Sequence, residues 1–210
     1  MNLMKKKVLV ICLIFGAAFG ISMSMATDRT YHSDMGYSIT IPEGWTMLKR
    51  ENVRNKPKIV DAAAGAAHNQ EGFSGISQKI ISEVRQLVVG GDVEYFYSQD
   101  PRFSISVCQE KGNIPETGFD EETVCNNLED ELTEQNGKEI KVYTCQAEMV
   151  SGRPAMKMVA DDYWKGCKYI QYMVRKNGNE IFLFTANSRD GKFEEMKKEF
   201  EDVMGSLQME

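Results

Sequence analysis

The amino-acid sequence predicts an α+β protein, a single α/β/α sandwich whose mostly antiparallel, twisted sheet has about six to seven strands and carries helices on both faces. The main observation is the stretch 152–207, where three strand-like segments separated by short turns precede an amphipathic helix. Neither of the last two strands has a polar face, which is typical of a sheet covered on both sides. The chain has 210 residues, enough for one domain of ordinary size.

The first 26 residues have the composition of a signal peptide. Lysines at positions 5–7 precede an apolar run over 8–23, and Ser24-Met25-Ala26 supplies small residues where a signal peptidase reads them. We expect cleavage near Ala26, export to the periplasm, the cell envelope or the medium, and a mature domain over 27–210. Two alternatives stay open: retention of the segment as a membrane anchor, since about 20 apolar residues span a bilayer, and lipidation at Cys12.

The charge of the mature chain argues against anionic partners. Removing the three lysines of the leader leaves 22 basic and 31 acidic residues, a formal charge of −9. Nucleic acids and anionic membrane surfaces require concentrated positive charge, which the mature sequence lacks. The expected partner is therefore another envelope or secreted protein, with membrane contact only through an uncleaved leader.

Four cysteines remain after the leader is removed. They are Cys108, Cys125, Cys145 and Cys167. An even number in an exported chain predicts two disulfides with three possible connectivities, of which Cys108 with Cys125 would close the shortest loop. Reduced, buried thiols are the alternative. The wide spacing contains no Cys-x-x-Cys motif, so neither a metal site nor a redox pair is expected, and no cofactor is implied.

The first predicted strand follows a polar lead-in and lies within GYSITIPEGW, residues 36–45. Its apolar side chains alternate with polar ones, as in a strand with one buried face. Pro42 ends the strand, because proline cannot donate to a sheet ladder. Trp45 is predicted to fold back onto the core, and residues 50–72 are expected to form an irregular excursion.

Apolar periodicity then predicts a helix over 75–89 and two strands over 92–98 and 102–109. In the second of these strands three apolar residues point to one face and Ser104, Ser106 and Cys108 to the other.

A further helix is predicted over 121–135, with Asp120 as N-cap and Asn136-Gly137 as its end. Six of its residues are acidic, and a solvated helix face is favoured over a cation-binding or partner-binding patch. A strand over 138–150 should follow.

The last block contains strands over 153–163, 167–175 and 180–187. Asn177-Gly178 is expected to supply the positive φ angles of a type I′ hairpin. Asp190 is the expected N-cap of the final helix. The apolar stripe of that helix is Phe193, Met196, Phe200, Val203 and Leu207.

Three pieces of the chain resemble the PsbP-like (Mog-type) family. They are GYSITIPEGW, the turn Ser151-Gly152-Arg153-Pro154-Ala155, and the ending in which Tyr172-Met173-Val174, an Asn-Gly turn, 181–186 and a helix closing at Gly205-Ser206-Leu207 follow one another. The resemblance implies an α/β/α sandwich and an accessory role through protein binding. That family includes bacterial exported proteins of unknown function and a Ran-binding import factor, and some bacterial relatives resemble chaperones that hold apolar helices. It has no shared catalytic residues to transfer.

No catalytic constellation stands out in the sequence. The only histidines are His32 and His68, both in expected loops, and the adjacent Asp161 and Asp162 should point to opposite faces of a strand. We therefore expect a non-enzymatic binding or accessory module, with Tyr163 and Trp164 at a turn as candidate contact residues. A carrier of a small apolar ligand or lipid is one alternative, requiring a pocket between sheet and helices. A hydrolase is the other.

Overall fold

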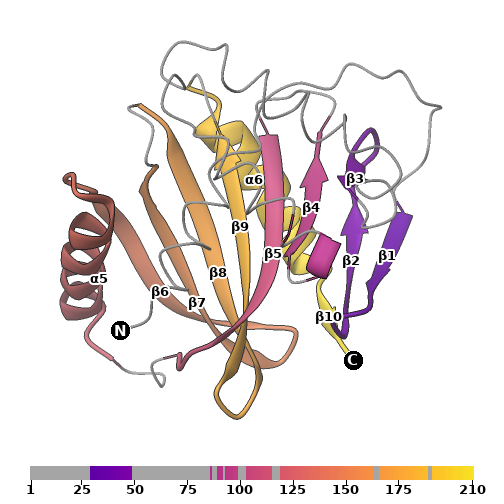
Figure 1. Cartoon of the computed structure of the whole chain (residues 1–210), viewed down its shortest axis with the longest axis horizontal. Coiled ribbons are helices and arrows are strands. Elements are labelled where there is room, and N and C mark those ends of the chain that lie inside the picture. The colour runs from indigo at the N-terminus through magenta and orange to yellow at the C-terminus, as the bar shows by residue number, and fades with distance from the viewer. Residues whose placement is uncertain are drawn as a thin grey trace.

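The structure is a computed structural model that describes residues 29–48, 86, 89–91, 93–98, 103–114, 119–162, 166–188 and 191–210. Within them, seven strands form one antiparallel sheet in the order β3-β4-β5-β9-β8-β7-β6, and three form a smaller sheet in the order β1-β2-β10. Helices α5 (Glu121–Asn136) and α6 (Phe193–Gly205) lie on opposite faces of the large sheet (Figure 1). The predicted sandwich is confirmed, with the small sheet as an addition.

The strands have the following bounds: β1 Arg29–Ser33, β2 Tyr37–Ile41, β3 Thr46–Leu48, β4 Val93–Tyr97, β5 Phe103–Lys111, β6 Val142–Val150, β7 Arg153–Asp161, β8 Lys168–Asn177, β9 Glu180–Ser188 and β10 Gln208–Met209.

The main core lies between the large sheet and α6. Alternate residues of β8 and β9 point to this face, so that Tyr172 lies opposite Phe184 and Val174 opposite Phe182 in the register. The predicted stripe of α6 packs on them, and the rings of Phe200 and Tyr172 meet edge to face at 5.7 Å between centroids. Burial of this stripe is what holds the C-terminal helix on the sheet.

A smaller core lies on the other face, beneath α5. Leu132 is buried there against Met158, Ala160 and Tyr169. Both predicted helix ends are confirmed: the Asp120 carboxylate accepts a hydrogen bond from the Glu122 amide, and Gly137 has the left-handed φ of 68°. Hydrogen bonds from the Thr123 hydroxyl and from backbone amides hold the pKa of Asp120 below its ordinary value.

Two predicted details of the last block are wrong. Helix α6 begins at Phe193 with Lys192 at the N-cap position, two residues after the predicted N-cap Asp190, which itself lies outside the described residues. The β8–β9 hairpin exists, but β8 extends through Asn177, and around this turn only Gly178 has a positive φ among the described residues. The pair of positive φ angles typical of a type I′ turn occurs instead in the β6–β7 hairpin, at Ser151 (52°) and Gly152 (70°).

The small sheet as a unit was not predicted: β2 was expected as a strand, but its partners β1 and β10 are short and were not. The lead-in forms β1, which pairs with β2. Glu94 on β4 joins the two sheets: its carboxylate accepts hydrogen bonds from Tyr31 and Ser33, both at 2.8 Å, and from Tyr37. Burial, together with the nearby Glu94 charge, raises the pKa of Tyr37 well above its ordinary value. Trp45 is buried as predicted, and its indole N–H donates to Glu199 at 2.5 Å.

Several predictions fall outside the described residues. They are the leader over 1–26, the excursion over 50–72 and nearly all of the helix over 75–89. Among the helices that the structure describes, none is both long enough and apolar enough to cross a bilayer.

Candidate functional site

A groove of about 370 Å³ lies between α5 and the large sheet, and it is the candidate site. Its floor is formed by β7, β8 and β9, and one wall is formed by α5. One end is formed by residues 110–113, which are the last two residues of β5 and the two that follow it. Within that end, a Cβ at Gly112 would lie 2.7 Å from Cδ1 of Ile181, so a larger residue there would require the end of the Ile181 side chain to move.

The floor consists of residues that the strand register places in rows. Met156, Met173 and Leu183 lie opposite one another on β7, β8 and β9. The next row contains Met158 and Gln171. Methionine side chains are flexible and polarisable, so a floor of three methionines can adapt to apolar groups of different shapes.

Gln171 is the polar residue of this floor. Its side chain is buried, with 6% of the residue exposed, and its amide nitrogen donates to the Thr185 hydroxyl at 2.8 Å. Within the described part of the chain this is the one hydrogen bond of the amide. The floor therefore offers an apolar surface with a single amide that can orient a bound polar group.

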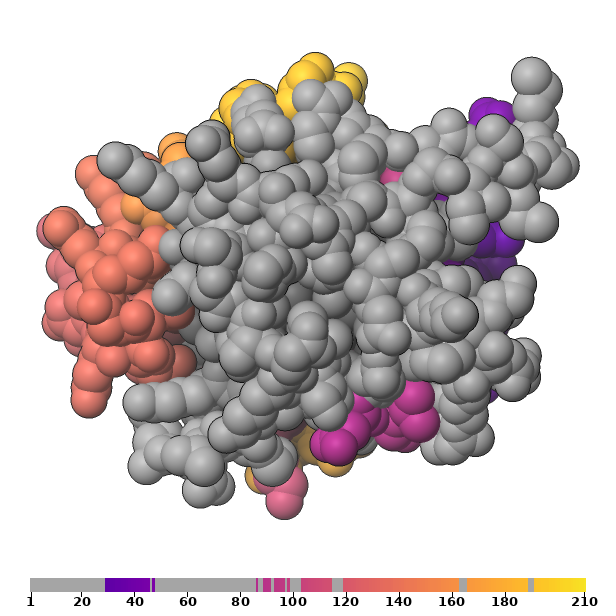
Figure 2. Space-filling model, turned by 45° about the horizontal axis from the view of Figure 1, so that its top comes forward, coloured from indigo at the N-terminus to yellow at the C-terminus, as the bar shows by residue number. Residues whose placement is uncertain are grey.

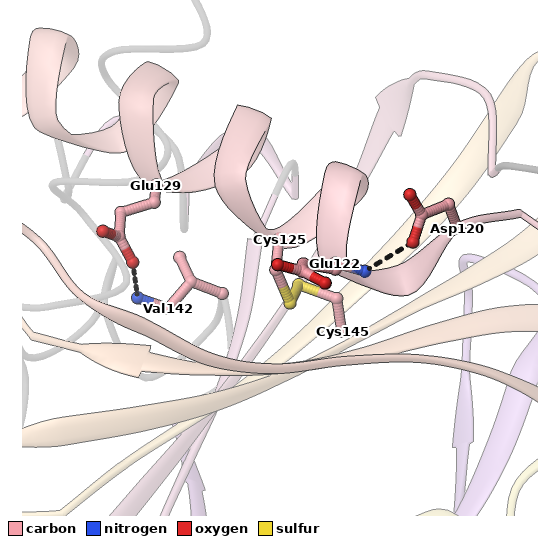
Figure 3. Close-up of a disulfide and its surroundings, with 6 residues drawn as sticks. All are labelled: Asp120, Glu122, Cys125, Glu129, Val142 and Cys145. Carbon is pink, nitrogen blue, oxygen red and sulfur yellow. Dashed lines mark hydrogen bonds between the residues drawn. A yellow bond between two sulfur atoms is a disulfide. The ribbon is translucent and has the colours of Figure 1, made fainter.

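Two contacts attach α5, the wall of the groove, to β6 (Figure 3). The disulfide Cys125–Cys145 joins the helix to β6, with 5.5 Å between the Cα atoms. One turn further along, the Glu129 carboxylate accepts a hydrogen bond from the Val142 amide at 2.8 Å. Val124, Leu128 and Leu132, which pack on the same side of the sheet as the disulfide, line the groove from α5. Asn127, Glu131 and Gln135 add polar side chains to this lining.

The wall is also acidic. Helix α5 carries six carboxylates and neither lysine nor arginine. One of the six, Glu131, lines the groove and accepts a hydrogen bond from Gln135 at 2.9 Å. The whole lining carries two carboxylates, Glu110 and Glu131, and one ammonium group, Lys111. A ligand with apolar groups and a positive charge placed near Glu131 would complement this arrangement.

The predicted contact residues Tyr163 and Trp164 lie outside the described residues. The two adjacent aspartates before them diverge as expected. Asp161 accepts a hydrogen bond from the Tyr143 hydroxyl at 2.9 Å, whereas the buried Asp162 accepts one from Asn187 at 3.0 Å.

The cysteine prediction is partly wrong. The described residues contain one disulfide, Cys125–Cys145, while Cys108 and Cys167 are not in disulfide bonds. Cys108 cannot reach Cys125, because β5 is separated from β6 by three intervening strands. Four strand spacings amount to about 19 Å, whereas bridged Cα atoms lie within about 7 Å.

Sequence reasoning identified α5 but not the groove beside it. The methionines of the floor lie on three strands, and only their register shows that they form one surface. The feature of the sequence that could have indicated this surface is the absence of a polar face on these strands.

No protein-family model matches the chain, and no curated protein matches it. Several solved structures, however, match the chain. The cyanobacterial PsbP protein (CyanoP) from Synechocystis sp. PCC 6803 matches with a TM-score of 0.53 and 11% identity, over 92% of this chain and 98% of that one. The chain therefore has the PsbP-like fold, as its resemblance to that family implied.

Two further structures match less closely. The Ran-binding protein Mog1p from Saccharomyces cerevisiae has a TM-score of 0.47 and 10% identity, over 89% of this chain and 96% of that one. The immunity protein TplEi from Pseudomonas aeruginosa, solved in complex with a peptide, has a TM-score of 0.46 and 10% identity, over 89% of this chain and 99% of that one. At identities this low, no functional residue of these proteins can be assigned to a residue of this chain.

Proposed function

We propose that the protein is an exported, non-enzymatic binding module that holds an apolar, positively charged segment of another envelope or secreted protein in the groove between α5 and the sheet. The observation that supports this proposal best is the floor of three methionines beside α5, a helix that is joined to β6 by a disulfide and a hydrogen bond. The disulfide and the Glu129 contact hold the wall in place before binding, so little conformational entropy is lost on binding.

The size of the groove favours side chains of a protein segment over a whole lipid. Sites for small molecules span about 300–1,000 Å³, and this groove of about 370 Å³ lies near the lower limit. A carrier of a small apolar ligand is the second candidate, because the same floor would accept one. A hydrolase has less support: the described lining carries the carboxylates Glu110 and Glu131 but no histidine, cysteine or serine.

The turn that contains Tyr163 and Trp164 stays a predicted second contact. It connects β7 to β8, two of the strands that form the groove floor. Replacing both residues by alanine should weaken partner binding, and unchanged affinity would remove the turn from the proposal.

The experiment uses two adjacent asparagines on α5. Asn127 lines the groove and Asn126 does not, and both are exposed. Asn127→Trp should fill the groove at little cost in stability, whereas Asn126→Trp adds the same side chain outside it. The probe is a fluorescein-labelled 18-residue amphipathic helix of leucine and lysine, followed by fluorescence anisotropy.

We expect Asn127→Trp to weaken binding of the probe at least tenfold and Asn126→Trp to leave it within twofold of the unaltered chain. Glu131→Gln should weaken it more than Glu134→Gln, since Glu134 lies outside the groove lining. Equal effects of the two tryptophan variants would refute the site. If oleate binds and the peptide does not, the carrier function replaces the proposed one.

A further inference from the structure

Among the described strands, β6 forms one edge of the large sheet. It is the last strand of the seven-stranded sheet, and within the described residues it pairs only with β7. In an antiparallel strand every second residue directs its N–H and C=O groups away from the neighbouring strand. The Glu129 carboxylate satisfies one such group, the Val142 amide. Residues 144–150 continue beyond that contact in unbroken register with β7.

Over residues 144–150, this edge lacks the devices that usually prevent strand addition. Natural edge strands are blunted by lysine, proline, a bulge or shortness. Strand β6 is nine residues long and contains no lysine, arginine or proline, and its single irregularity lies between Val142 and Thr144. The opposite edge of the sheet, β3, has only three residues.

The exposed apolar residues lie on the same strand. Among the described residues the large apolar side chains classed as exposed are Tyr143 (43%) and Met149 (59%), both on β6. The Tyr143 ring is covered by the Lys168 ammonium, 3.8 Å from its centroid. Met149 remains as an apolar side chain beside the open part of the edge. In Figure 2 the α5 and β6 region forms one flank of the molecular surface.

Charges near the edge indicate which strand would fit. Glu122, Cys125 and Glu129 share one side of α5, the side tied to β6 by the disulfide. Glu148 adds a carboxylate from the strand itself, 3.8 Å from Lys157. A second copy of the chain, paired through β6 about a two-fold axis, would bring two acidic α5 helices together on one face. Electrostatics therefore disfavours self-pairing and favours a basic strand.

We infer that residues 144–150 of β6 form a docking edge for an extended segment of another protein that carries lysine or arginine, and that this segment adds an eighth strand to the sheet. Main-chain hydrogen bonds supply the affinity, and alternate side chains contact Met149 on one face and Glu148 on the other. This site lies on the opposite side of α5 from the groove and does not depend on it.

The test uses the full chain and three nine-residue peptides in which lysine alternates with valine and threonine. One peptide is unmodified, the second is N-methylated at every second residue, and the third has glutamate in place of lysine. Binding is followed by anisotropy and by amide chemical-shift changes. The protein variants are Met149→Lys, which adds a gatekeeper charge at an exposed position, and Met149→Leu as its matched control.

We expect the lysine peptide to shift amides within 144–150, and both the N-methylated and the glutamate peptides to bind at least tenfold more weakly. Met149→Lys should lower affinity at least fivefold and Met149→Leu less than twofold. Three results would overturn the inference: equal binding of the N-methylated peptide, shifts confined to groove residues such as Met156 and Met173, or a dimer in sedimentation that Met149→Lys abolishes.

Discussion

Breaking the Cys125–Cys145 disulfide should lower the free energy of unfolding by about 3 kcal/mol. The two residues are 20 positions apart in the sequence. Closing a loop of that length removes about 11 cal/mol/K of entropy from the unfolded chain, or about 3.3 kcal/mol at 25 °C. We expect the fold to survive, because Leu132 stays buried and the contacts of Glu129 with Val142 are independent of the disulfide.

The assay compares urea unfolding of the unaltered chain with that of Cys125→Ser/Cys145→Ser, monitored by circular dichroism. A matched control is Cys167→Ser, which removes a thiol outside the disulfide. A thiol titration of the denatured full chain provides a second readout. Of the five cysteines, three should react before reduction and all five after it.

The reasoning fails if the double variant unfolds within about 0.5 kcal/mol of the unaltered chain, a change typical of an ordinary surface substitution. It also fails if all five thiols react without reduction. The same variant tests the role of the wall: with α5 less constrained, the groove should bind the leucine–lysine peptide more weakly. Unchanged affinity would mean that the remaining contacts of α5 hold the wall by themselves.

Three further predictions concern the core and the joint between the sheets. Glu94→Ala should cost about 3 kcal/mol in urea unfolding, since three hydroxyls lose their acceptor, and Glu94→Gln should cost less; equal losses would contradict this. Burial raises the pKa of Tyr172 to about 12 and that of Tyr37 well above 10. Unfolded tyrosines lose their protons near pH 10, so the contribution of these two tyrosines to stability should be constant below about pH 10 and fall above it; an unfolding midpoint that is equal at pH 9 and pH 11 would refute the assignment. Phe200→Ala should cost about 4 kcal/mol by leaving a cavity, and a loss below about 1 kcal/mol would show that α6 does not depend on this ring.

The large sheet and its two described helices could be predicted because each depends on a local pattern. The caps of α5 at Asp120 and Gly137 are determined by residue types whose backbone preferences are strong. The stripe of α6 was correct for the same reason, although the position of its N-cap was not. Without a side-chain cap, packing determines where α6 begins.

Other features depend on residues that are far apart in the chain. The small sheet forms because β10 at the C-terminus pairs with β2 near the N-terminus, and short strands of this kind carry little periodic signal. The choice of Cys145 as the partner of Cys125 likewise follows from strand order. Loop lengths alone left the connectivity open, and the strand order excludes the pair with the shortest loop, Cys108 with Cys125.

Helix α5 shows why an acidic face could not be assigned from composition alone. Six carboxylates on one helix are ordinarily a solvated surface, and most of them are exposed here. Two of these carboxylates differ from the rest in their surroundings. Glu129 accepts a hydrogen bond from the Val142 amide at the edge of the sheet, and Glu131 lines the groove. The helix therefore lies between two surfaces, the methionine floor and the edge of β6, and gives both an acidic border. Because the two surfaces lie on opposite sides of the same helix, a substitution at Asn127 should affect only the groove, and one at Met149 only the edge.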